Sequence, residues 1–289
     1  MKILMEYKIL NNGVKMPMIG LGVFRITDLN ECEEVVYQAI KNGYRFIDTA
    51  AAYQNEEAVG KAIKRSGIDR KDLFISSKLW VTGASYEGAK RSFNDSLKRL
   101  GLDYLDLYVI HQPFGDYYGA WRALTELYQA GKIKAIGVDN FTQAQLADLI
   151  AFNEIKPAVN LLETHPMFQR NNEHQYLESE NIAQIAWSPF AAGKFDIFKN
   201  DTLNAIGQKY NKSVAQVILR WLNQRGIVAV PKSSNVERMK QNINIFDFQL
   251  SDSDMNQIAK LNQNETLGGI RSTAKEVNDF LKVARTLDI

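Results

Sequence analysis

The segment Arg45-Phe46-Ile47-Asp48 is a short apolar run that ends in a charged residue, and two later segments repeat this pattern. Leu73-Phe74-Ile75-Ser76-Ser77-Lys78 ends in a lysine, and Tyr104-Leu105-Asp106-Leu107-Tyr108-Val109-Ile110-His111 ends in a histidine. Short runs rich in β-branched and aromatic residues are typical of buried parallel strands. The interior of such a strand does not tolerate the terminal polar residue. Each run therefore predicts a strand with a polar side chain at its C-terminal end.

The same alternation of strand and helix extends from Met18 to about residue 243. It predicts strands at 18–22, 45–49, 73–79, 104–111, 132–138, 157–163, 182–188 and 227–231. The helical stretches between them are expected at 30–42, 55–66, 85–100, 118–130, 142–152, 171–180, 202–224 and 235–243. Eight such units in 289 residues predict an α/β fold, a (β/α)₈ TIM barrel that forms a single domain over residues 1–289.

Both ends of the chain add to this barrel. The pair Asn12-Gly13 predicts a β-hairpin ahead of the repeating units, at the N-terminal mouth of the barrel. Ser251 begins a further helix to about residue 261, and a last helix starts near Ala274. The competing fold is an open doubly wound sheet, which carries G-x-G-x-x-G after its first strand. Residues 20–25 have only the first two glycines, and this favours the barrel.

Composition limits the partners of the chain. An apolar share of 45%, a charged share of 24% and a net charge of +2 are those of a soluble globular protein. We expect no nucleic-acid or membrane partner, and we expect a monomer that acts on a small molecule. The single cysteine, Cys32, and the short, Glu6-interrupted apolar run of residues 1–7 predict a cytoplasmic protein.

Four residues suggest acid–base chemistry: Asp48, Lys78 and His111 at strand ends, and Tyr53 in the loop after Asp48. Polar side chains at the C-terminal ends of barrel strands converge on one face. A lysine ammonium beside a phenol lowers the pKa of the phenol, and a carboxylate keeps the lysine charged and in place. A histidine can then orient a carbonyl oxygen. These side chains have no redox chemistry, so carbonyl reduction at this site requires a nicotinamide cofactor.

Each of the four residues alone has a simpler explanation, as a helix cap or a solvated strand end. Their coincidence at one end of a barrel favours catalysis. A metal-dependent hydrolase on the same fold needs clustered histidine and carboxylate ligands such as His-x-His, and the sequence has no such motif. We therefore expect no metal.

Residues 43–56, 77–80, 100–107 and 109–113 resemble the signature segments of the aldo-keto reductase family, in order and spacing, within a similarity that covers residues 7–250. The resemblance implies an NADPH-dependent carbonyl reductase with Asp48, Tyr53, Lys78 and His111 in the roles described above. Residues 111–113 and 186–190 resemble the bacterial branch that acts on 2,5-diketo-gluconate, glyoxal and methylglyoxal.

The segment after the last strand predicts a phosphate site, since it combines a helix start with basic and hydroxyl side chains. The resemblance assigns Lys232, Ser233, Arg238 and Asn242 to the 2′-phosphate and adenine of NADPH, Trp187 to stacking on the nicotinamide, and Asn140 to cofactor binding. Two positions depart from the family pattern: Asp139 replaces a serine, and Leu161 replaces a glutamine. Both changes affect the expected contacts to the nicotinamide carboxamide.

Aromatic residues near the strand ends predict the substrate pocket, with Phe24, Trp80 and Phe114 as its walls. Arg271, in the polar segment before the last helix, is a candidate partner for a substrate carboxylate. The predicted reaction is the reduction of small aldehydes, 2-oxoaldehydes or keto sugars to alcohols. The alternative is a non-catalytic barrel that binds NADP(H) as a sensor or subunit.

Overall fold

A computed structural model describes residues 5–269, 271–287 and 289, so the first four residues of the N-terminal run lie outside the described part. The chain begins with the expected hairpin, in which β1 (Tyr7–Ile9) pairs antiparallel with β2 (Lys15–Pro17). Asn11 Nδ2 donates to Pro157 O and Asn12 Nδ2 donates to Lys134 O. Both carbonyls precede strands of the main sheet. The hairpin therefore covers the N-terminal ends of those strands.

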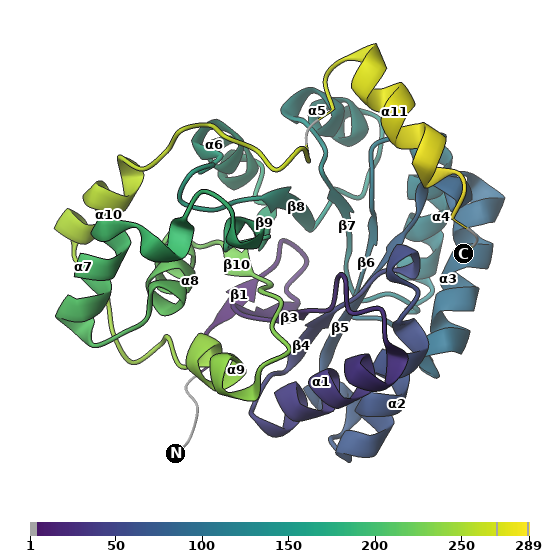
Figure 1. The fold of residues 1–289 in the computed structure, drawn as a ribbon. Coiled ribbons are helices and arrows are strands. Elements are labelled where there is room, and N and C mark those ends of the chain that lie inside the picture. Colours follow the sequence, from purple (N-terminus) through teal and green to yellow (C-terminus); the bar gives the residue numbers. More distant parts are fainter. Residues whose placement is uncertain (1–4, 270, 288) are drawn as a thin grey trace.

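The main sheet has eight parallel strands in sequential order, which confirms the predicted barrel (Figure 1). A parallel bridge between Ile19 and Ala229 joins its two edges, and Gly20 N donates to Ala229 O. The sheet is thus closed on itself, unlike an open doubly wound sheet. The strands are β3 (Leu21–Gly22), β4 (Phe46–Asp48), β5 (Phe74–Leu79), β6 (Leu107–Ile110), β7 (Ile136–Asp139), β8 (Val159–Glu163), β9 (Ala183–Trp187) and β10 (Val228–Ala229).

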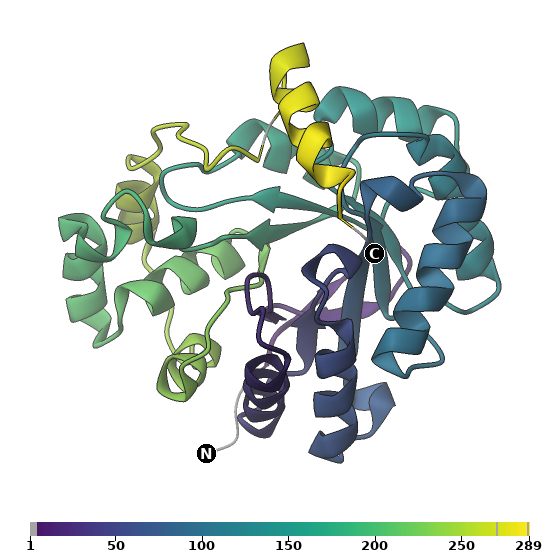
Figure 2. The same ribbon diagram turned by 45° about the vertical axis from the view of Figure 1, so that its right-hand side comes forward.

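Helices follow the strands on the outside of the barrel (Figures 1 and 2). Side-chain caps begin two of them, since Asp28 Oδ1 accepts from Glu31 N and Thr142 forms a capping box with Gln145. The helices before the C-terminal region are α1 (Leu29–Lys41), α2 (Glu56–Ser66), α3 (Tyr86–Leu100), α4 (Tyr117–Gln129), α5 (Gln143–Ala151), α6 (Asn171–Ser179), α7 (Asp201–Tyr210), α8 (Val214–Gln224) and α9 (Val236–Ile243).

The prediction of one helix over 202–224 is wrong, because the structure has two helices there. Asn211 ends α7 in the left-handed region, with φ 53°. Ser213 then caps α8 in a capping box with Gln216. A residue in this region cannot continue a right-handed helix, and the capping box supplies partners for the free N–H groups of a new one.

Two more helices, α10 (Asp252–Ala259) and α11 (Ala274–Ala284), confirm the expected C-terminal additions. The chain after α10, as far as residue 269, runs along the upper rim of the barrel in Figure 1. It is fixed to the end of β8, because Glu163 accepts from Thr266 Oγ1 at 2.7 Å and from Leu267 N at 2.7 Å. Trp80 Nε1 donates to Ala284 O at 2.9 Å, so α11 lies over the C-terminal end of β5.

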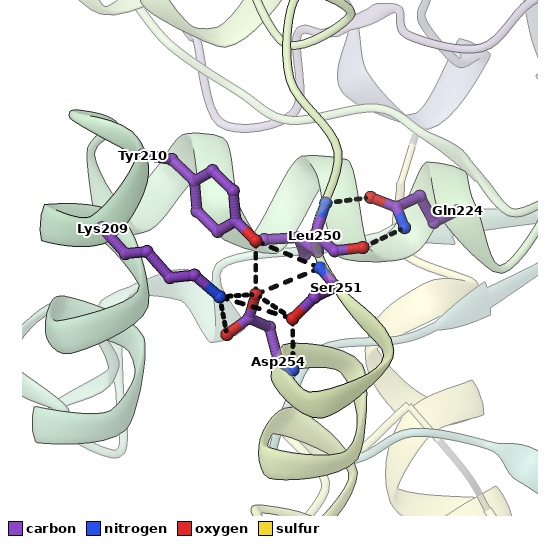
Figure 3. A network of polar contacts seen from close by, with 6 residues as sticks. All are labelled: Lys209, Tyr210, Gln224, Leu250, Ser251 and Asp254. Carbon is purple, nitrogen blue, oxygen red and sulfur yellow. Dashed lines mark hydrogen bonds and ion pairs between the residues drawn. The ribbon is translucent and has the colours of Figure 1, made fainter.

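A polar network fastens α10 to α7 and α8 (Figure 3). The buried Asp254 carboxylate accepts from Ser251 Oγ at 2.6 Å, from Tyr210 OH at 2.5 Å and from Lys209 Nζ at 2.9 Å. Gln224 exchanges two hydrogen bonds with the backbone of Leu250. Burial alone would raise the pKa of Asp254, but the hydrogen bonds from Ser251, Tyr210 and Lys209 outweigh burial and hold it well below its ordinary value.

Asp254→Ala is expected to lower the free energy of unfolding by about 2–3 kcal/mol at neutral pH, since several charge-assisted hydrogen bonds are lost together. The depressed pKa makes this contribution complete above about pH 4, the ordinary value of an aspartate. It is lost as the pH falls toward the folded-state value. Urea unfolding at neutral and acid pH measures both effects. Asp252→Ala, at an exposed position in the same helical turn, is the control; equal losses in the two variants would contradict the role given to the network.

Candidate active site

Asp48 and Lys78 form a buried ion pair at the C-terminal ends of β4 and β5. Lys78 Nζ donates to Asp48 Oδ2 at 2.6 Å and to Thr49 O at 3.0 Å. Ser76, which lies opposite Asp48 in the strand register, donates from Oγ to Asp48 Oδ1 at 2.6 Å. Asp48 is only 4% exposed and Lys78 only 1%. Burial alone would lower the pKa of Lys78, but the negative groups around it, Asp48 first and then Tyr53 and Asp139, together outweigh burial, and the net shift is upward.

Tyr53 ends a 3₁₀ turn (Ala51–Tyr53), which places its ring beside this ion pair. Lys78 Nζ lies 5.2 Å from the ring centroid, and the His111 ring lies 5.7 Å from it. Burial raises the pKa of Tyr53, and Lys78 counteracts this only in part, so the net pKa lies above the ordinary value. The lysine lowers the pKa of Tyr53 as the sequence predicts, but burial, which the sequence does not reveal, has the larger effect.

His111 directly follows β6, is 8% exposed and faces both Tyr53 and Trp80. Its pKa is well below the ordinary histidine value, first because of burial and then because of the nearby cations Lys78 and Arg271. The imidazole is therefore neutral at pH 7. Its Nδ1 is buried and has no hydrogen-bond partner among the described residues. A neutral ring at this position can hydrogen-bond to a carbonyl oxygen.

The predicted pocket residues lie around the same point, together with one that the sequence did not indicate. The Phe24 ring packs on Tyr53 with centroids 5.0 Å apart, and Trp80 packs on His111 at 5.0 Å. Phe280 of α11 contacts both Trp80, at 5.8 Å, and Phe114, at 5.5 Å. No periodicity connects α11 with the barrel strands, so the sequence has no signal for this contact.

The two residues that depart from the family pattern are Asp139, at the C-terminal end of β7, and Leu161, within β8. Asp139 is 3% exposed, and its Oδ1 accepts from Asn140 Nδ2 at 2.7 Å. Burial raises the pKa of Asp139 well above its ordinary value; Lys78 opposes this and Asp48 adds to it. A carboxyl group that holds its proton can donate a hydrogen bond, which an ionised one cannot. Leu161 is 1% exposed and can neither donate nor accept.

The residues expected to hold NADPH lie at this end of the barrel in two groups. Trp187 ends β9, is half-buried, and donates from Nε1 to Asn140 Oδ1 at 3.0 Å. The second group follows β10: Ser233 is 7% exposed and Asn242 4% exposed, whereas Lys232 and Arg238 are exposed. Within the described residues neither of these two cations forms an ion pair. Lys232, in the loop before α9, and Arg238, in the first turn of α9, are two cations without carboxylate partners in this part of the chain, which fits a phosphate group.

Residues 5–269, 271–287 and 289 contain neither a cluster of metal-binding side chains nor a membrane-spanning helix. No group of three or more histidine, cysteine or carboxylate side chains in this part of the chain is placed to hold a metal ion. No helix in the same part is both long and apolar enough to cross a membrane.

Comparison with known proteins gives a consistent result. The model of the aldo/keto reductase family matches residues 18–263. Glyoxal reductase of Bacillus subtilis (strain 168) is 51% identical over 260 residues, which cover 90% of this chain and 94% of the relative. Methylglyoxal reductase DkgA of Escherichia coli (strain K12) is 39% identical over 262 residues, with 90% and 94% covered.

Solved structures agree with these relatives. An aldo-keto reductase of Bombyx mori in complex with NADP superimposes with a TM-score of 0.88 at 34% identity, and the match covers 93% of this chain and 96% of that one. An aldo/keto reductase of Brucella melitensis gives a TM-score of 0.86 at 42% identity, with 90% and 100% covered.

Proposed function

The chain belongs to the aldo/keto reductase family, and we propose that it reduces 2-oxoaldehydes, small aldehydes or keto sugars with Tyr53 as the proton donor. It is an NADP-dependent oxidoreductase that acts on carbonyl groups. One observation carries the assignment of Tyr53: a buried ammonium, Lys78, is held by Asp48 and Thr49 O beside the phenol.

The proton step follows from the charges around Tyr53. Its raised pKa keeps the phenol protonated at neutral pH, so the group is an acid before the reaction. As the substrate oxygen gains negative charge, the proton moves from the Tyr53 hydroxyl to that oxygen. The phenolate that forms lies beside the Lys78 ammonium, which stabilises it in a low-dielectric site. Neutral His111 hydrogen-bonds to the substrate oxygen and orients it.

Residues at the same end of the barrel are proposed to bind the cofactor. NADPH, when bound, supplies the hydride that reduces the carbonyl carbon. We assign Lys232, Ser233, Arg238 and Asn242 to its 2′-phosphate and adenine, and Asn140 and Trp187 to the nicotinamide. Because the cationic pair Lys232 and Arg238 complements a phosphate, we expect NADPH to be preferred over NADH. A protonated Asp139 can make one hydrogen bond to the carboxamide, and Leu161 makes none.

The activity test is NADPH consumption with a panel of neutral carbonyl compounds, repeated with NADH. Reduction of glyoxal or methylglyoxal is the result that supports the proposal. NADPH binding without turnover of any carbonyl compound would instead favour the alternative of a non-catalytic NADP(H)-binding sensor or subunit.

The pH dependence of reduction is expected to be flat from about pH 7 to about pH 9, since a free phenol titrates near 10 and burial raises the pKa of Tyr53 further. The acid form of Tyr53 is then present throughout this range. Oxidation of the alcohol needs the phenolate as base, so its rate should increase with pH over the same range. Initial rates in both directions measure this. A loss of reduction centred near neutral pH would contradict the assignment of Tyr53.

Several properties of the protein are proposed with its activity. We propose that the chain acts as a monomer, as one domain over residues 1–289, in the cytoplasm, with a small carbonyl compound and no nucleic acid as its partner. The near-neutral charge of +2 and the single cysteine support this.

A further inference from the structure

A cavity of about 330 Å³ lies beside the catalytic group at the same end of the barrel. Its walls come from the loops after β6 and β7, the first turns of α5 and α6, and the segment before α11. Gln112, the neighbour of His111, and Asn140, the partner of Trp187, both line it. The cavity therefore adjoins the position where a carbonyl substrate reacts.

Arg170 lines this cavity with a guanidinium that has unused donors. Its side chain is only 6% exposed, and Nε is buried without a hydrogen-bond partner. Within the described residues, its one ion-pair contact joins Nη2 to Glu173 Oε1 at the long distance of 3.6 Å. Arg170 is held in the left-handed region, with φ 54°, directly ahead of α6, whose first turn has no side-chain cap. A buried cation at a helix start with donors to spare suits an anionic ligand.

Arg271 lines the cavity from the segment before α11. Its Nη1 donates to Gln112 Oε1 at 3.2 Å and to Gly269 O at 3.3 Å, and its guanidinium lies 3.9 Å from the centroid of the Phe280 ring. It forms no ion pair within the described part of the chain. Its charge lowers the pKa of His111, so the cation is near the catalytic group as well as in the cavity wall.

Two carboxylates also line the cavity, and they differ in how firmly they are held. Glu163 is 2% exposed, and its oxygens are engaged by His165, Thr266 and Leu267. The side chain of Glu173 is 30% exposed, and its one polar contact within the described part of the chain is the 3.6 Å contact to Arg170. A monoanion that enters the cavity can thus replace Glu173 at Arg170, one charge for another. A dianionic phosphate would bring excess negative charge beside Glu163.

We propose that this cavity is a subsite for the carboxylate of an oxo-acid substrate, with Arg170 and Arg271 as its ligands and the carbonyl group at Tyr53 and His111. The inference deepens the proposed function and rests on it. The substrate class is a chain with an aldehyde or ketone at one end and a carboxylate at the other.

The test compares acids with neutral substrates of the same length: 4-oxobutanoate, 5-oxopentanoate and 6-oxohexanoate against their methyl esters. For each pair, the ratio of kcat/KM for the acid to kcat/KM for the ester measures the effect of the carboxylate charge. We expect a ratio above one for the wild type at one or more chain lengths. Arg170→Asn, chosen because asparagine tolerates the left-handed region, and Arg271→Gln should each lower this ratio about tenfold.

Glu173→Gln should change the ratio in the opposite direction, because it removes the anion that competes for Arg170. Arg122→Gln, at an exposed position of α4, is the matched control for loss of one positive charge and should leave the ratio unchanged. If Arg170→Asn does not fold, the other two variants still test the subsite, because Arg271→Gln should lower the acid-to-ester ratio and Glu173→Gln should raise it.

Two failures can be told apart. If the wild type reduces neither the acids nor the esters, the proposed function fails, and this inference with it. If the wild type reduces the esters but the ratio is the same in the wild type, Arg271→Gln and Glu173→Gln, or falls equally in Arg122→Gln, only the carboxylate subsite is overturned.

Discussion

Lys78→Met is expected to lower kcat for carbonyl reduction by about 100- to 10,000-fold, the range of a proton-transfer contribution. Without the ammonium, the phenolate of Tyr53 forms in a buried site beside the Asp48 carboxylate, and its pKa rises further above an already raised value. The same change leaves Asp48 as a buried charge whose one remaining side-chain hydrogen bond among the described residues comes from Ser76. We therefore expect a loss of about 3–5 kcal/mol in the free energy of unfolding.

The double variant Asp48→Asn with Lys78→Met separates these two effects. It removes both charges, so stability should return toward the wild-type value, whereas activity should remain as low as in Lys78→Met. Urea unfolding and initial rates of NADPH consumption measure the two quantities. Recovery of activity together with stability would show that Lys78 has only a structural role.

Tyr53→Phe is expected to lower kcat by at least about 100-fold, because it removes the proton donor and nothing else. Phenylalanine keeps the ring that packs between Phe24, at 5.0 Å, and His111, at 5.7 Å. The variant should fold normally and bind NADPH with unchanged affinity. Steady-state kinetics with methylglyoxal measure the loss, and a fluorescence titration with NADPH provides the control. Phe24→Leu, which alters the packing on the same ring without removing the hydroxyl, should have a much smaller effect on kcat.

The barrel and the place of its polar strand ends could be predicted from local sequence alone. Asp48, Lys78 and His111 each follow an apolar run, and parallel strands bring the C-terminal ends of such runs together whatever the details of the loops. The structure places these three residues and Tyr53 in one cluster. It also confirms the N-terminal hairpin that Asn12-Gly13 indicated.

Element boundaries inside the long helical stretch were harder to predict. The apolar pattern continues through residues 202–224 and gives no indication that α7 ends at Asn211. The signal was nevertheless present: Ser213 and Gln216 have the spacing of a capping box, and an asparagine two residues earlier is a frequent helix end.

The features that sequence could not predict depend on packing between distant segments. Phe280 reaches the pocket because α11 lies across the end of β5, and the connection before α11 is too irregular to predict its path. The pKa of Tyr53 depends on how deeply its loop is buried, and neighbouring residue types do not reveal this. Arg170 is likewise visible as a ligand candidate only through its burial and its unused donors.

A single-turnover experiment tests the role of Tyr53 most directly. Wild type and Tyr53→Phe, each saturated with NADPH, are mixed rapidly with methylglyoxal, and NADPH loss and alcohol formation are followed together. We predict one alcohol formed per NADPH consumed by the wild type, and a rate at least about 100-fold lower in the variant. Equal rates in the two proteins, or NADPH consumption by the wild type without alcohol formation, would contradict the account.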